Sequence, residues 1–269
     1  MRRPNRLALS LLLLPAFLCA EEASSPKSLT VEQVLDKALS AHGGAEAFRK
    51  IKTLVMKFQV DMPAQGIKMS TEMIQKAPDL FYSLSVVPGI VRQEMGYDGK
   101  SGWAKDPVMG LRAQTEDEIA ERRRSSLSAW DWRTVYKKAE LKGKEEITLE
   151  GAKASVPAWV VLLTPERGKP TTRWYDAESF LLLREETVTV SPQGEMRAVA
   201  EPGDYRKVGG TLQPHLVRVS AMGMQMVMKV LEMKDNAEID ETKFLKPGED
   251  DEAEDGEAPK HGKAPVPEP

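Results

Sequence analysis

Thirteen methionines among 269 residues are the side chains with the most distinctive chemistry in this sequence. Met222, Met224, Met226 and Met228 recur at intervals of two, which would place all four on one face of an unbroken strand. A hairpin at Gly223 fits the same residues equally well. It would leave Met226 and Met228 on the return strand.

Three interpretations of these methionines compete. Thioethers are soft ligands for Cu(I), but His215, the nearest histidine, would lie on the face opposite to the even-numbered methionines. Unbranched thioether chains also form an adaptable wall for flexible apolar ligands such as acyl chains. The third interpretation is a Met-rich core without a ligand. We favour the lipid wall and the plain core over copper, and both remain open at this point.

The motifs of common enzyme classes are missing from the sequence. It contains no GxSxG elbow, no HExxH, no GxxxxGK[ST] and no strand-linked GxGxxG. The three histidines are far apart, and Asp98, Asp176 and Asp204 occupy predicted turns, where an aspartate has a local backbone role. We therefore predict no catalytic residue, metal ligand or cofactor. A hydrolase with an unrecognised carboxylate pair is a less favoured alternative.

Composition excludes further classes of protein. A net charge of −3 does not suit a strongly basic nucleic-acid binder, and we expect no nucleic-acid partner. The single cysteine excludes a disulfide framework, an all-Cys zinc site and an iron–sulfur cluster. The 29% charged and 41% hydrophobic residues are typical of a soluble globular domain.

The N-terminus has the pattern of a secretory signal peptide. Arg2, Arg3 and Arg6 precede an apolar run, Leu7–Ala20, that is too short to span a bilayer comfortably. We predict a signal peptide at 1–20, a flexible segment at 21–28 and a periplasmic protein. In the less favoured alternative Cys19 carries a lipid anchor, although a bulky leucine precedes it.

The rest of the chain divides into one domain and a tail. Residues 247–269 are rich in acidic residues and proline, so they cannot bury enough apolar surface to offset the entropy of ordering, and we predict a disordered tail. No long like-charge run or repeat divides residues 29–246. We predict one domain there.

Local patterns predict helices in two places and strands elsewhere. Thr30 and Gln33 form a capping box for a helix that should end at Gly43. A second capping box at Thr115 predicts a helix to about Ser128. Strands of period two fill the remainder, so we predict a mainly β (α+β) fold: an unclosed, strongly curved antiparallel β-barrel of about 11 strands, with helices covering the open side.

The apolar face of these strands is the predicted site. Two tryptophans, Trp103 and Trp130, could stand at its mouth. With them, the predicted lining consists of Leu54, Met56, Phe58, Val60, Met69, Met73, Leu84, Met226 and Met228.

The order of elements resembles the bacterial outer-membrane lipoprotein-sorting proteins of the LolA/LolB-like superfamily. The resemblance spans residues 29–247 and rests on an ordered set of short motifs, namely His42–Gly44, Tyr97–Gly99 with Gly102 and Trp103, Val160–Thr164, Trp174–Asp176 with Leu181–Arg184, Asp204–Gly210 with Pro214, and Ile239 and Asp240 before Phe244. It implies a curved open barrel whose apolar concave face holds acyl chains without covalent chemistry. The acidic tail is not part of that pattern.

These observations predict a periplasmic binding or carrier protein for lipoprotein acyl chains or other apolar lipids. Membrane-associated envelope proteins are further expected partners. The alternative is a non-carrier module for envelope interaction or sensing, with a filled β core. A wide concavity would favour the first function and a filled one the second.

Overall fold

The computed structural model describes residues 29–191 and 194–248. Three α-helices and three short 3-10 helices lie in this part of the chain: α1 (Val31–Ala41), α2 (Gly44–Lys50), α3 (Glu116–Arg123), η1 (Pro63–Gln65), η2 (Trp132–Thr134) and η3 (Glu241–Phe244). The strands are β1 (Thr53–Met62), β2 (Ile67–Lys76), β3 (Leu80–Val87), β4 (Val91–Tyr97), β5 (Gly102–Asp106), β6 (Gly110–Ala113), β7 (Tyr136–Ile147), β8 (Val156–Pro165), β9 (Thr171–Asp176), β10 (Leu182–Ser191), β11 (Gly194–Val208), β12 (Thr211–Ala221) and β13 (Met224–Asp235).

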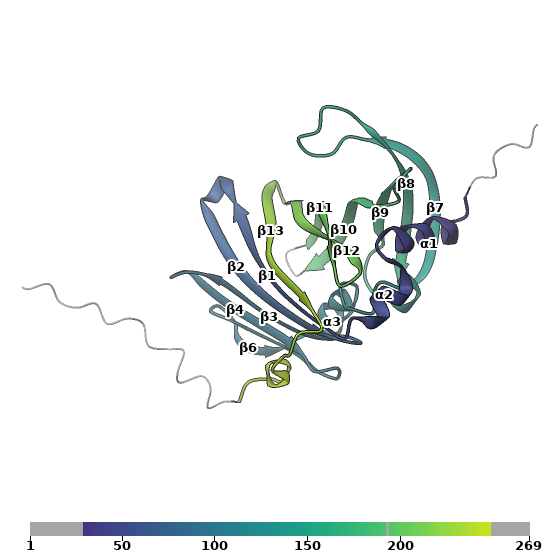
Figure 1. Cartoon of the computed structure of the whole chain (residues 1–269). Coiled ribbons are helices and arrows are strands. Elements are labelled where there is room, and N and C mark those ends of the chain that lie inside the picture. The colour runs from purple at the N-terminus through teal and green to yellow at the C-terminus, as the bar shows by residue number, and fades with distance from the viewer. Residues whose placement is uncertain (1–28, 192–193, 249–269) are drawn as a thin grey trace, which may run out of the picture.

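All the strands join one antiparallel sheet, in the order β6-β5-β4-β3-β2-β1-β13-β12-β11-β10-β9-β8-β7. The last strand pairs with the first, so β13 connects the two halves of a strongly curved sheet (Figure 1). β6 and β7 form its two edges within the described chain, and the sheet is unclosed. The mainly β, unclosed architecture is confirmed.

The predicted strand number was too low, because the sheet has 13 strands rather than about 11. The short strand β6 pairs with β5 after a tight turn, and its four residues are too few to show a period-two pattern. At the other end of the chain the hairpin alternative is correct. Ala221 pairs with Met224 across a two-residue turn, in which Met222 and Gly223 both have positive φ.

Strand register separates the side chains onto two faces. Met56 pairs directly with Met73 of β2 and with Met233 of β13, so these methionines share a face. Residues from both halves of the sheet line one cavity on that side, including Met56 of β1 and Arg173 of β9. The face that carries Met56 is therefore the concave one.

Helix α1 packs on the concave face of the second half of the sheet. Its capping box is present as predicted, with Thr30 and Gln33 exchanging hydrogen bonds. Leucine, valine and alanine side chains of its apolar stripe join the first core cluster, whose buried members are Val34, Leu35, Ala38, Tyr136, Val161, Leu163 and Tyr175. Amphipathic spacing thus positions the helix against β7, β8 and β9.

A glycine at the end of α1 holds the helix close to β12. Gly43 has φ +116°, and an added Cβ would lie 2.5 Å from the carbonyl oxygen of Gly210. The backbone N–H of Leu212 donates to the carbonyl of His42 at 2.9 Å. Only a residue without a side chain allows both this backbone conformation and this approach.

Helix α3 begins as predicted but ends earlier. The capping box of Thr115 and Glu118 is present, and Ile119 packs against Phe81 and Tyr97 on the concave face. The helix ends at Arg123 rather than near Ser128. After it, serine hydroxyls bond the preceding carbonyls and the chain turns, which is how serine competes with helix continuation.

The convex face carries its own apolar cluster. Ile74, Tyr82 and Trp103 pack there against Phe244 of η3, which is only 1% exposed. The indole N–H of Trp103 donates to the Phe244 carbonyl at 3.0 Å. The segment after β13 therefore covers this part of the outside of the sheet.

Several predicted segments lie outside the described residues. These are the signal peptide at 1–20 with Cys19, the segment at 21–28, and the tail at 247–269 except for its first two residues. The domain limits at 29–246 and the covering of the open side by helices stay predictions. Within the described chain, no helix is both long enough and apolar enough to cross a membrane.

Candidate ligand-binding cavity

A cavity of about 440 Å³ lies on the concave face, between the sheet and the helical segments. Leu54 and Met56 of β1 and Met73 of β2 form part of its sheet wall. Strand alternation places them together, because Met56 and Met73 are cross-strand partners. The sheet therefore contributes a wall of flexible, apolar side chains.

Helical segments form the facing wall. Leu35 and Leu39 of α1 line the cavity, as do Phe48 of α2 and Trp130 after α3. The rings of Phe48 and Trp130 are stacked, with centroids 6.2 Å apart and an interplanar angle of 17°. Aromatic and aliphatic groups from three separate chain segments thus meet here, as in typical small-molecule sites.

The second half of the sheet contributes a more polar wall. Arg173 and Tyr175 of β9 line the cavity with Tyr205 of β11. The Arg173 Nε donates to Oε2 of Glu185 at 2.5 Å, and the Tyr205 hydroxyl donates to the carbonyl of Leu182 at 2.7 Å. Burial raises the pKa of the Tyr205 hydroxyl, so this group is protonated at neutral pH.

His42 lies where α1 meets this polar wall. Its Nδ1 is 2.8 Å from the carbonyl of Ala38, and its ring contacts the edge of Tyr205. Burial lowers the pKa of His42 and outweighs the opposite effect of its hydrogen bond to the Ala38 carbonyl. His42 is therefore a neutral cavity residue, with Nδ1–H as the donor.

Four residues predicted from sequence line this cavity: Leu54, Met56, Met73 and Trp130. Five others extend along the same concave side of the sheet but do not line it. Strand register assigns their face, because Val60 pairs with Met69 of β2 and with Met228 of β13, and directly paired residues share a face of the sheet. These five are Phe58, Val60, Met69, Met226 and Met228.

Two predicted residues belong to the opposite face. Leu84 pairs with Glu72, next to the pair Met73 and Ser83, so its side chain points to the convex side. Trp103 is 2% exposed in the convex cluster. The predicted places of Leu84 on the apolar face and of Trp103 at the mouth of the cavity are therefore wrong, because counting periods within each strand does not determine the register between strands.

Sequence reasoning missed the residues that the helices and β9 contribute. The apolar stripe of α1 was recognised, but it was assigned no place in a site. Arg173 has no local signal, since it reads as one residue of an ordinary strand. Only the curvature of the sheet brings β9 opposite β1.

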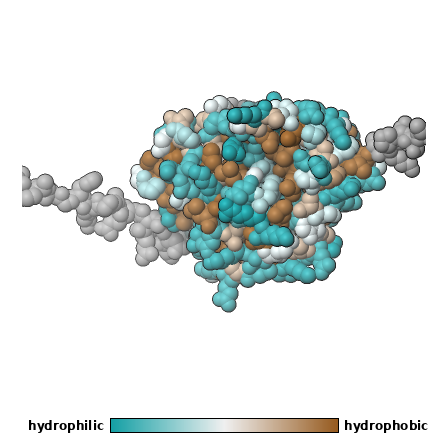
Figure 2. Space-filling model, turned by 45° about the horizontal axis from the view of Figure 1, so that its top comes forward, coloured by the Kyte–Doolittle hydropathy of each residue, from teal (hydrophilic) through white to brown (hydrophobic). Residues whose placement is uncertain are grey.

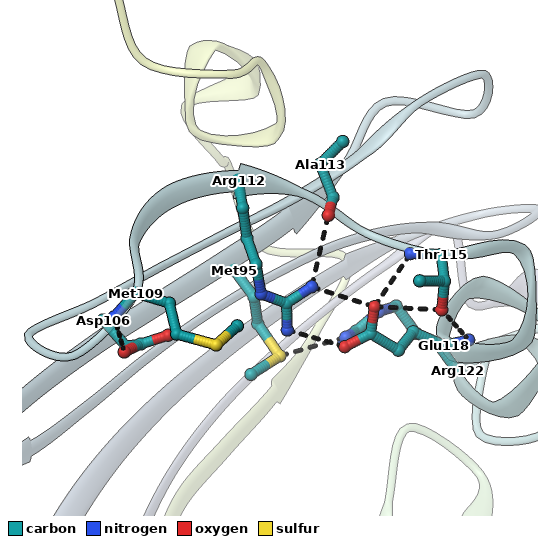
Figure 3. A network of polar contacts seen from close by, with 8 residues as sticks. All are labelled: Met95, Asp106, Met109, Arg112, Ala113, Thr115, Glu118 and Arg122. Carbon is teal, nitrogen blue, oxygen red and sulfur yellow. Dashed lines mark hydrogen bonds and ion pairs between the residues drawn. The ribbon is translucent and has the colours of Figure 1, made fainter. Parts of the chain in front are cut away.

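A polar network joins the start of α3 to the neighbouring strand β6 (Figure 3). Arg112 and Glu118 form a bidentate ion pair of 2.7 and 2.9 Å, and this pair lowers the pKa of Glu118 to about 2. The Arg122 guanidinium lies 4.2 Å from the Phe81 ring centroid, and its Nη2 is 3.0 Å from the sulfur of Met95. Burial lowers the pKa of Arg122 to about 10, so it stays charged.

A second pocket, of about 420 Å³, lies on the convex side around Arg184, Glu201 and Trp174. Arg184 pairs with Glu201 at 2.6 Å, and the backbone N–H of Glu150 donates to the same carboxylate at 2.7 Å. These polar groups satisfy one another. Most residues that line this pocket are polar or charged, in contrast to the lining of the concave cavity.

Apolar side chains are also exposed at hairpin turns, notably Ile90, Val108 and Met222. On the face that Figure 2 brings forward, apolar patches are interrupted by polar side chains. Scattered exposed apolar residues are normal on soluble proteins.

In the described part of the chain, no three His, Cys, Asp or Glu side chains come together as a metal site. The concave cavity is thus the candidate site.

Comparison with solved structures identifies the fold. The chain is similar to a LolA superfamily protein from Nitrosomonas europaea, with a TM-score of 0.57, 14% identity, and 81% of this chain and 99% of that chain covered. A DUF1329 family protein from Desulfovibrio piger gives a TM-score of 0.53 and 14% identity over 81% of this chain and 98% of that one.

A domain from Vibrio parahaemolyticus, assigned to outer membrane lipoprotein sorting, gives a TM-score of 0.51 and 10% identity over 80% and 95% of the two chains. No family model and no curated protein matches the sequence. The structural similarities show a LolA-like fold, and that prediction is confirmed. At these identities they show the fold alone.

Proposed function

We propose that this protein binds the acyl chains of a lipid or lipoprotein in the concave cavity and carries them, without covalent chemistry, in the bacterial periplasm. The observation that carries the proposal is the cavity wall. Flexible Met56 and Met73 face Phe48, Leu39 and Trp130 across a volume of about 440 Å³. Pockets for small ligands typically measure about 300–1,000 Å³.

The lining suits a chain that has no fixed shape. Methionine side chains adjust to irregular apolar surfaces, and each buried methylene group contributes about 0.8 kcal/mol. A cavity filled by its own side chains would instead favour the interaction module.

The fold supports the same assignment. The chain resembles structures named for the LolA superfamily and for outer membrane lipoprotein sorting. Because one fold hosts many functions, this likeness adds to the argument from the cavity and does not replace it. The proposal involves no enzyme activity and no cofactor.

Native mass spectrometry of the purified protein tests the proposal, followed by extraction and identification of the lipid. We expect masses of acyl-containing molecules that leave upon activation. Displacement of the neutral fluorophore N-phenyl-1-naphthylamine by added lipids then measures affinity. A protein that neither retains nor competes for lipid would refute the carrier function.

Two methionines of β2 provide a matched pair of variants. Met73 and Met69 are both partly buried on the concave face, but only Met73 lines the cavity. A lysine in the cavity would lose its hydration when an acyl chain enters, and this loss costs binding free energy. Met73→Lys should therefore lower lipid affinity at least about tenfold, and Met69→Lys should leave it close to wild type. Equal losses in both variants would contradict this location of the site.

A further inference from the structure

The cavity has one charged group. Arg173 is the only Asp, Glu, Lys or Arg among the described residues that line it. Its side chain keeps 18% of its surface exposed although β9 is flanked by β8 and β10 and its charge acts on His42 at the end of α1. The guanidinium therefore lies deep in the protein, with part of its surface open to the cavity.

Arg173 retains both its charge and part of its hydrogen-bonding capacity. Burial alone would lower its pKa, but Glu185 and Tyr175 outweigh that effect and hold the pKa well above its usual value. The bond from Nε to Glu185 and a side-chain hydrogen bond to Tyr175 use two of the five N–H donors of the guanidinium. Glu185 itself does not line the cavity.

Besides Arg173, the lining of the same cavity contains a donor that has no acceptor among the described residues. Trp132 lines it, and its indole Nε1 is buried without a hydrogen-bond partner among the described residues. Unsatisfied buried donors are uncommon in proteins. Two donor groups and a neutral His42 thus stand in a lining whose other members are largely apolar.

We propose that the cavity binds an acidic amphiphile in one orientation, with its carboxylate or phosphate against Arg173 and its chain along Met56 and Met73. This inference rests on the proposed function, since it assigns the polar end of the same ligand. Charge-assisted bonds from arginine to such groups are short and strong, and the planar guanidinium suits two oxygens at once. A cationic amphiphile would meet a buried like charge.

The orientation follows from the two walls. Met56 and Met73 belong to β1 and β2, whereas Arg173 belongs to β9, which lies in the other half of the sheet. A ligand that spans the cavity therefore has an apolar end and a polar end. The positive charge selects which end of an amphiphile points toward β9.

Displacement of N-phenyl-1-naphthylamine from the full chain tests the proposal with three ligands of equal chain length: hexadecanoate, hexadecanol and hexadecyltrimethylammonium. Hexadecyl phosphate in a fourth arm separates a carboxylate preference from a phosphate preference. We expect either acid to bind about tenfold or more tightly than the alcohol, and the ammonium most weakly. Equal affinity for the acids and the alcohol would overturn the inference and leave the proposed function standing. Binding of none of the four would overturn both.

Three variants locate the preference. Arg173→Gln should remove the advantage of the acids without weakening hexadecanol binding. Glu185→Gln keeps Arg173 and removes its competing carboxylate, so it should increase acid affinity severalfold. Arg197→Gln is the control, because this arginine is on the convex side in β11 with 69% of its side chain exposed.

Circular dichroism shows whether each variant is folded. Should Arg173→Gln leave Glu185 unpaired and unfold the protein, then Glu185→Gln decides the question. Unchanged or weaker binding of hexadecanoate and hexadecyl phosphate by folded Glu185→Gln would overturn the inference. An equal effect of Arg197→Gln would do the same, since it would trace the preference to general surface charge.

Discussion

The size of the concave cavity predicts how affinity depends on the length of an acyl chain. If a methylene group takes about the 30 Å³ that a water molecule occupies in the liquid, a cavity of about 440 Å³ holds roughly 15 such groups. Affinity for saturated fatty acids should therefore rise up to chains of about 15 carbons and then level off.

The slope below that length follows from burial of methylene groups. Each contributes about 0.8 kcal/mol, and about 1.4 kcal/mol corresponds to a tenfold change in affinity. Two additional carbons should therefore tighten binding by roughly 15-fold. Isothermal titration calorimetry across even chains from octanoate to icosanoate measures both the slope and the position of the plateau.

A cavity-filling variant moves the plateau. Ala129 lines the cavity on the segment after α3. Ala129→Phe adds a phenyl ring, about six carbon-sized groups of volume, so the longest chain that still gains affinity should shorten by about six carbons. Ala152→Phe, in an exposed turn after β7, is the control and should leave the plateau unchanged.

Two results would refute this reasoning. Affinity independent of chain length would show that methylene burial does not drive binding. A plateau that stays in place in folded Ala129→Phe would show that the chain occupies another part of the molecule.

Three further predictions concern the framework of the site. Gly43→Ala should lower the free energy of unfolding in urea by more than about 2 kcal/mol, because the new Cβ would collide with the backbone of Gly210. Gly44→Ala is the control: its Cβ would contact no atom, and it should cost about 1 kcal/mol through the positive φ alone. Equal costs in the two variants would contradict the close packing of Gly43. Trp103→Phe should cost about 1–3 kcal/mol by leaving the Phe244 carbonyl unpaired, with lipid affinity unchanged. Ionised Glu118 contributes stability that is present above its ordinary pKa of 4.5 and is lost as pH falls toward about 2. The difference in free energy of unfolding between wild type and Glu118→Gln, measured in urea, should therefore shrink across that interval. A difference that does not change with pH would refute the assignment.

Local signals in the sequence were sufficient for the class of fold and for most elements. Capping boxes at Thr30 and Thr115 are interactions between residues three positions apart, so they can be read without tertiary structure. Alternation along β1 and β2 likewise placed Met56 and Met73 on the apolar faces of adjacent strands, and the register pairs them. These predictions succeeded because each depends on contacts within one element or one hairpin.

The membership of the site was decided by tertiary structure. Leu84 and Trp103 have the apolar character of concave residues, yet cross-strand register turns them to the convex side. Arg173 reads as an ordinary strand residue, but the curvature of the sheet brings β9 across from β1 and makes it part of the cavity lining.

The physical reason for this division is the range of the forces involved. Backbone periodicity and capping act over a few residues, so the amino-acid sequence by itself determined a mainly antiparallel β-protein with a Met-rich face. Register between strands, sheet twist and the packing of α1 on β7–β9 depend on the fit between separate elements, and α1 and β8 are more than 100 residues apart. Only that fit decided that the apolar wall encloses a cavity and that one arginine faces into it.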